Sequence, residues 1–78
     1  MINHAFTAAQ ISAAETAAVT HDLRIRVWEG NSISRIYVSD RREQCGYVQI
    51  DQYGDIDYEY RRGSNSRRDA VKRIYEAV

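Results

Sequence analysis

Residues 23–39, LRIRVWEGNSISRIYVS, alternate between apolar and polar side chains on both sides of a short polar segment. An alternation with a period of two is typical of strands that bury one face. The apolar positions are Leu23, Ile25, Val27, Ile36 and Val38. Gly30 and Asn31 lie between the two runs and favour a tight turn with glycine first. The stretch therefore predicts a β-hairpin with one apolar face.

Two further runs, YVQID at 47–51 and IDYEY at 56–60, continue the alternation. Their inward positions are Val48, Ile50, Ile56, Tyr58 and Tyr60. Opposed residues on neighbouring strands must share a face, which restricts the register. Turns centred on Gly30–Asn31 and on residues 53–55 satisfy this rule, with an assumed Val38–Val48 pair in the middle. The resulting pairs are Ile25 with Ile36, Val38 with Val48, and Ile50 with Tyr58.

Helices are predicted at both ends of these strands. Thr7 and Gln10 have the spacing of a capping box at the start of FTAAQISAAETAAV, residues 6–19, and Phe6 can staple onto Ile11. Seven alanines between residues 5 and 18 favour this helix, in which Ile11 and Val19 are the large apolar anchors.

In residues 63–78, Gly63 ends the last strand and Ser66 is the expected N-cap. Val71, Ile74, Tyr75 and Val78 form an apolar stripe with helical spacing. The predicted fold is α+β: one domain, residues 1–78, with a four-stranded antiparallel meander and both helices on one face (α-β-β-β-β-α).

The opposite face of the predicted sheet carries charge. One predicted row across the strands is Arg26, Arg35, Asp51 and Asp57, and the next is Arg24, Tyr37, Gln49 and Glu59. Trp28 lies beside them, opposite Ile33. The rows make the first hairpin basic and the second acidic, with like charges opposed, which normally destabilises a sheet. A partner protein or a two-fold homodimer would offset that cost; a solvated face is the alternative.

The composition restricts the function class. The chain has 78 residues, eleven basic and eleven acidic side chains, and a single cysteine, Cys45. An internal disulfide is excluded, and neither a signal peptide nor a membrane span is recognisable, so we expect a cytoplasmic protein. His4 and His21 lack partners at metal-ligand spacing, and no catalytic or cofactor motif is present. Cys45 is either an ordinary thiol or one whose pKa is lowered by Arg41 and Arg42. A non-enzymatic binding function without cofactor or metal is expected.

Four arginines, Arg61, Arg62, Arg67 and Arg68, surround the predicted start of the last helix, where main-chain N–H groups favour anions. Ser66, Arg67, Arg68 and Ala70 resemble the Ser-Lys-Lys-x-Ala-Lys signature in the final helix of double-stranded-RNA-binding domains. Val71 departs from that pattern. The resemblance implies phosphate recognition, so a small nucleic-acid-binding module is one alternative.

Residues 13–40, AAETAAVTHDLRIRVWEGNSISRIYVSD, resemble small phage anti-CRISPR proteins. This resemblance implies a compact, non-enzymatic inhibitor in the host bacterial cytoplasm. Type I members bind subunits of a CRISPR surveillance complex and block its binding to target DNA. The acidic residues Asp51, Asp55, Asp57 and Glu59 would then meet basic side chains of the complex.

The leading hypothesis is such an inhibitor; a nucleic-acid binder and a self-associating accessory protein are the alternatives. The predicted partner-binding residues are Arg24, Arg26, Trp28, Arg35, Tyr37, Asp51, Asp57, Glu59, Arg61, Arg62, Arg67 and Arg68.

Overall fold

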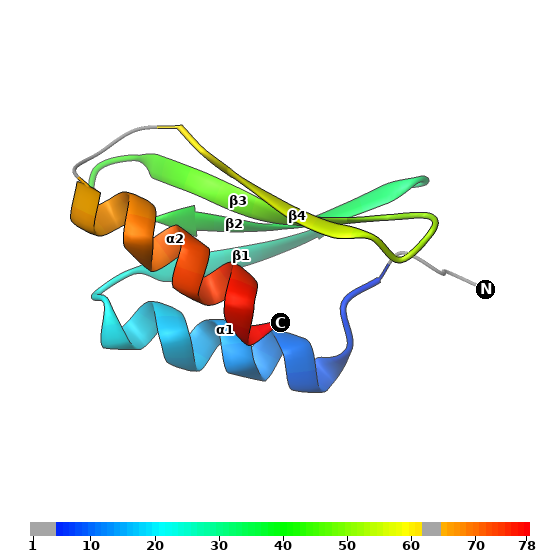
Figure 1. Cartoon of the computed structure of the whole chain (residues 1–78), viewed down its shortest axis with the longest axis horizontal. Coiled ribbons are helices and arrows are strands. Elements are labelled where there is room, and N and C mark those ends of the chain that lie inside the picture. Colours follow the sequence, from blue (N-terminus) through cyan, green and yellow to red (C-terminus); the bar gives the residue numbers. More distant parts are fainter. Residues whose placement is uncertain (1–4, 62–64) are drawn as a thin grey trace.

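The computed structural model describes residues 5–61 and 65–78 and has two helices flanking four strands (Figure 1). The elements are α1 (Ala8–Thr20), β1 (Arg24–Glu29), β2 (Ile33–Ser39), β3 (Gln44–Asp51), β4 (Ile56–Tyr60) and α2 (Asn65–Ala77). All neighbouring strands are antiparallel and follow the order β1-β2-β3-β4. Both helices cover the same face of the sheet, α2 against β3 and β4, and α1 against α2 and β1. The predicted α-β-β-β-β-α fold is confirmed.

The predicted strand register is wrong by two residues in all three pairs. Ile25 pairs with Val38, Ile36 with Val48, and Ile50 with Ile56. A shift of two residues leaves every side chain on its predicted face, because side chains alternate with a period of two. The faces were therefore predicted correctly, while the neighbours across the strands were not.

The first hairpin is shifted because its turn centres on Asn31 and Ser32. The Gly30 N–H donates to the Ile33 carbonyl at 2.8 Å, so Gly30 and Ile33 form the hydrogen-bonded pair that closes the turn, directly after β1 ends at Glu29. Moving a two-residue turn by one position moves the register by two. Gly30 is needed there because a Cβ at this position would collide with the Trp28 ring and lie 2.9 Å from the Ile33 carbonyl oxygen.

The two other turns also differ from the prediction in their position. Gly54 adopts a φ of 84°, the left-handed conformation that ends a three-residue hairpin loop, and the Asp51 N–H donates to the Asp55 carbonyl. Asp40 closes the middle turn: its Oδ1 accepts the N–H groups of Arg42 and Glu43 at 2.7 and 2.8 Å. The middle connection is therefore a tight turn, and β3 begins earlier than predicted.

A bulge follows that turn. Ser39 pairs with Gln44 and Val38 pairs with Gly46, so Cys45 is the extra residue of β3. Two residues facing one on the partner strand bend the strand locally. Cys45 and Gly46 are consequently both buried.

The helices contribute to the core unequally. Val71 and Ile74 of α2 are fully buried, and Tyr75 and Val78 pack at the edge of the core, which confirms the predicted stripe. Ser66 lies inside α2 and is not its N-cap, since the helix begins at Asn65. His4, Arg62 and Gly63 lie outside the described residues.

Helix α1 has the predicted capping box: Thr7 Oγ1 accepts the Gln10 N–H, and the Gln10 side chain accepts the Thr7 N–H. The prediction that Val19 anchors this helix in the core is wrong, because Val19 is 70% exposed. The buried positions are Ala14 and Ala18, four residues apart. Their small side chains allow α1 to lie close to α2 and β1.

Ser34 is the buried polar exception on the helix-covered face. It lies between Glu29 and Ile50 across the strands, its side chain is fully buried, and its Oγ has no hydrogen-bond partner among the described residues. A buried hydroxyl without a partner costs about 1–3 kcal/mol of desolvation.

We predict that Ser34→Ala increases the free energy of unfolding by about 1 kcal/mol, because alanine removes the unpaired hydroxyl and leaves only a small void. Chemical denaturation with a constant m-value is the measurement. Ser39→Ala, in the same strand but half-exposed, is the control and should change stability by less than about 0.5 kcal/mol. A loss of stability in Ser34→Ala would contradict the prediction.

Candidate functional site

The outer face, the side of the sheet turned away from both helices, brings most of the predicted binding residues together. We define it by two rows that each cross all four strands. The rows are Arg26–Tyr37–Tyr47–Glu59 and Trp28–Arg35–Gln49–Asp57. Arg24 continues it at the start of β1.

The like-charge opposition predicted for this face is absent. Arg26 lies opposite Tyr37, not Arg35, and Asp57 lies opposite Gln49, not Asp51. The two-residue register shift has replaced the like-charged neighbours of Arg26, Arg35 and Asp57 with neutral ones, while Asp51 lies opposite Asp55 at the β3–β4 turn. The charge repulsion that a partner could have offset is therefore not found at the predicted Arg26–Arg35 and Asp51–Asp57 pairs.

Arg35 is the centre of the outer face. Its Nε donates to Gln49 Oε1 at 2.8 Å, and its Nη1 lies 3.4 Å from the Tyr37 hydroxyl. Its guanidinium carbon lies 4.2 Å from the centroid of the Tyr47 ring, within the range of a cation–π contact. The hydrogen bond with Tyr37, the nearby tyrosines and Glu59 raise the pKa of Arg35. Arg35 thus stays charged and is held in one orientation.

The contacts continue on both sides of Arg35 and connect all four strands. The Arg26 guanidinium lies 5.6 Å from the Tyr37 ring centroid, and Tyr37 meets Tyr47 edge-on with centroids 6.0 Å apart. The Tyr47 hydroxyl donates to Glu59 Oε2 on β4. Because Glu59 accepts this hydrogen bond and so stabilises the protonated phenol, the pKa of Tyr47 is raised, and partial burial acts in the same direction.

The outer face remains two-signed, with arginines on β1 and β2 and carboxylates on β4. Trp28 is 45% exposed at one edge. Tryptophan, tyrosine and arginine are the residues that most often dominate the binding energy of protein interfaces. The faces of Tyr37 and Tyr47 are contacted by guanidinium groups, so they do not form an open platform on which nucleic-acid bases would stack.

The other predicted site residues have separate positions. Asp51 Oδ1 accepts the N–H groups of Tyr53 and Asp55, at 2.8 and 3.0 Å, and so shapes the β3–β4 turn. Arg67 Nη1 donates to the His21 carbonyl at 3.1 Å, and its Nε lies 4.0 Å from Asp40. Arg61 and Arg68 are exposed. Arg62 lies outside the described residues. Arg67 therefore joins α2 to two turns and is not a freely presented cation.

Cys45 differs from the hypothesis of an activated thiol. It is 1% exposed, and burial raises its pKa, with the Asp40 charge acting in the same direction. Arg41 and Arg42 lie exposed in the preceding turn, and the pKa of the thiol is raised and not lowered.

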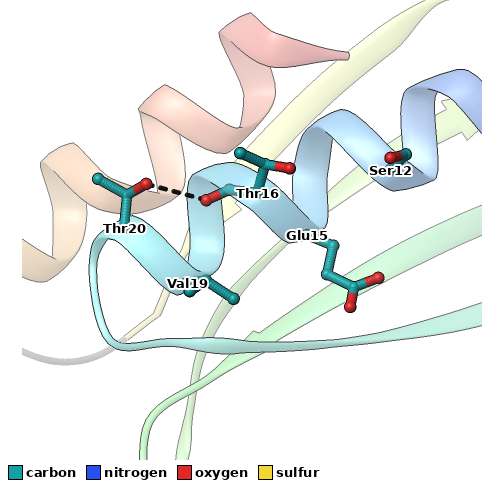
Figure 2. A pocket seen from close by; sticks show the side chains of 5 residues that line it. All are labelled: Ser12, Glu15, Thr16, Val19 and Thr20. Carbon is teal, nitrogen blue, oxygen red and sulfur yellow. Dashed lines mark hydrogen bonds between the residues drawn. The ribbon is translucent and has the colours of Figure 1, made fainter.

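A shallow pocket lies on α1 itself and is lined by Ser12, Glu15, Thr16, Val19 and Thr20 (Figure 2). The Thr20 hydroxyl donates to the Thr16 carbonyl at 3.0 Å within the helix. All five of these lining residues belong to α1. Within residues 5–61 and 65–78, no group of three or more His, Cys, Asp or Glu side chains is placed to hold a metal ion.

Comparisons with protein-family models, with curated proteins and with solved structures find no match to this chain. Neither α1 nor α2 is long and apolar enough to cross a membrane.

Tyr47 is the residue of the outer face that the sequence reasoning missed, and Gln49 was placed there but not named as a site residue. Both precede an inward residue in the 47–51 run, so the alternation itself placed them outward. Only the observed register brings Tyr47 beside Tyr37 and Glu59.

We predict that Glu59→Gln lowers the pKa of Tyr47, because the neutral amide no longer favours the protonated phenol. A raised folded pKa stabilises the fold below the ordinary tyrosine pKa of about 10, and this stabilisation disappears as the pH rises through the folded value. A tyrosine-resolved NMR titration above pH 9 is the measurement. Asp57→Asn is the matched control; an equal shift in both variants would contradict the role of Glu59.

We predict that Cys45 reacts slowly with a thiol reagent in the folded protein and fully after denaturation, because its thiol is buried and its pKa is raised. Timed labelling with and without guanidinium chloride is the measurement. Rapid labelling without denaturant would contradict the buried position.

Proposed function

We propose that this chain is a non-enzymatic protein-binding domain and that its outer face is the binding surface. The observation that carries the proposal is the contact network through Arg26, Arg35, Tyr37, Tyr47 and Glu59, which joins all four strands on the face that the helices leave open. Side chains already held in place lose less conformational entropy when a partner docks.

A protein partner fits this face better than a nucleic acid. The rows end in Glu59 and Asp57 on β4, whose charges repel phosphate, and the whole chain has a formal net charge of zero. Arg67, which belongs to the arginine cluster proposed for phosphate, already contacts His21 and Asp40. A partner with acidic groups beside basic ones would complement the two signs.

The resemblance of residues 13–40 to anti-CRISPR proteins gives the partner class. We infer that the partner is a subunit of a CRISPR surveillance complex in the cytoplasm of a host bacterium. Arg24, Arg26 and Trp28 of β1 lie within that segment and on the outer face. Occupying a DNA-binding channel of the complex would block the target sterically and needs no catalytic group.

The test is co-purification with assembled type I surveillance complexes, followed by competition with target DNA. We predict that Trp28→Ala or Arg35→Ala weakens binding by about 2 kcal/mol, or about 30-fold, as expected for a tryptophan or arginine that dominates an interface. Tyr53→Ala is the control, because Tyr53 is 80% exposed in the β3–β4 turn. Circular dichroism verifies that each variant is folded.

Failure to bind any surveillance complex would remove the proposed target. If binding occurs and both outer-face variants bind like the parent, the outer face is not the surface. Tight binding to duplex DNA that weakens steeply with salt and with Arg68→Ala would instead favour the nucleic-acid alternative.

A further inference from the structure

The two edges of the sheet differ in how their main-chain groups are occupied. Every second residue of β4 directs its main-chain N–H and C=O groups toward β3. The hydrogen bond from the Asp51 N–H to the Asp55 carbonyl shows which residues these are, so the N–H groups of Ile56, Tyr58 and Tyr60 point away from the sheet. The Tyr58 N–H donates to Asp57 Oδ1 at 2.8 Å, so the central donor of this edge is already used. A side-chain cap and two carboxylates protect β4 against a further strand.

The edge of β1 carries charges of both signs on Arg24, Arg26 and Glu29, but among the described residues no side chain caps its outward main-chain groups. The Gly30–Ile33 bond places the main-chain groups of Arg24, Arg26 and Trp28 toward β2. The N–H and C=O groups of Ile25, Val27 and Glu29 therefore point outward. The strand has six residues and contains no bulge, glycine or proline.

Exposed apolar side chains gather at this same edge. Of the three large apolar residues that are exposed in the described chain, Trp28 belongs to β1 and points to the outer face, and Val19 of α1 lies beside β1 on the helix-covered face. A groove beside the strand is lined by Glu15, Ala18, Val19, Leu23, Arg24 and Ile25. Glu15 and Val19 also line the pocket of Figure 2, so the open surface of α1 continues to the strand edge.

We propose that β1 pairs with β1 of a second copy of this chain, antiparallel and centred on Val27, to form a continuous eight-stranded sheet. In this register Val27 bonds to Val27 of the second copy and Ile25 bonds to Glu29, which joins all the outward N–H and C=O groups in six hydrogen bonds.

Side-chain complementarity selects this centre. Each Arg26 lies opposite the other copy's Trp28 at a non-hydrogen-bonded position, where a guanidinium and an indole ring attract each other. Centring the pair on Arg26 would instead oppose two arginines. Pairing β4 with itself would oppose Asp57 and Glu59.

The first experiment measures mass against concentration by sedimentation equilibrium. We expect twice the monomer mass of 9.0 kDa at high concentration and dissociation on dilution. Val27→Pro removes one outward N–H and keeps every bond to β2, so it should be folded and monomeric. Val27→Ala keeps the N–H and should still dimerise. A parent protein that is monomeric at every concentration, or a folded Val27→Pro dimer, would overturn the proposal.

A cross-linking experiment does not depend on the proline variant folding. Mixing Arg26→Cys protein with Trp28→Cys protein brings the two new cysteines opposite each other, at the Cα separation of about 4.5 Å typical of such pairs. The reciprocal Arg26–Trp28 pair remains intact. Mild oxidation should yield the mixed disulfide dimer faster than either variant alone yields its own; equal rates would overturn the register. Outer-face binding can fail or succeed independently, since Val27 lies on the helix-covered face.

Discussion

The register of the central β2–β3 pair determines both faces of the sheet at once. Ile36 lies opposite Val48, and both are fully buried under the helices. The same register places Arg35 beside Gln49 and Tyr37 beside Tyr47 on the outer face. A slip of one residue would turn the core outward, while a slip of two would keep the core face and disconnect the outer network. The core therefore excludes the first error, and the turns exclude the second.

The core determines which face each side chain occupies, and the turns determine the register. The sequence therefore allowed the faces to be predicted but not the register. Alternation assigned Ile25, Ile36, Val48 and Tyr58 to one face correctly, because burial of apolar surface depends only on the face. The first turn was misplaced because Gly30 was taken as its first residue, whereas Gly30 lies against the Trp28 ring and the turn follows it. Asp40 caps the middle turn by accepting the N–H groups of Arg42 and Glu43, a local preference of aspartate that the prediction did not use. The charge rows were wrong for the same reason, since they depended on register.

Helix α1 shows a different limit to prediction from sequence, namely which of its faces is buried. Its sequence is so rich in alanine that several faces have similar hydrophobicity, and the largest side chains do not identify the buried one. Ala14 and Ala18 are buried because small residues permit close packing, and this rotation leaves Val19 exposed beside β1. The exposed valine is thus a consequence of how α1 packs.

The contacts among the side chains of the outer face also limit the binding energy that a partner can gain. Arg35 already has a hydrogen bond to Gln49 and a ring contact with Tyr47, so its guanidinium group has favourable interactions before any partner carboxylate binds. Docking would therefore add rather little new pairing energy at this residue, and affinity must come from excluding water around a preformed set of rings and guanidinium groups. Such a surface selects partners by shape and by the placement of charge. A neutral chain can consequently be specific, because what a partner meets is the fixed arrangement of Arg26, Arg35 and Glu59 and not the net charge.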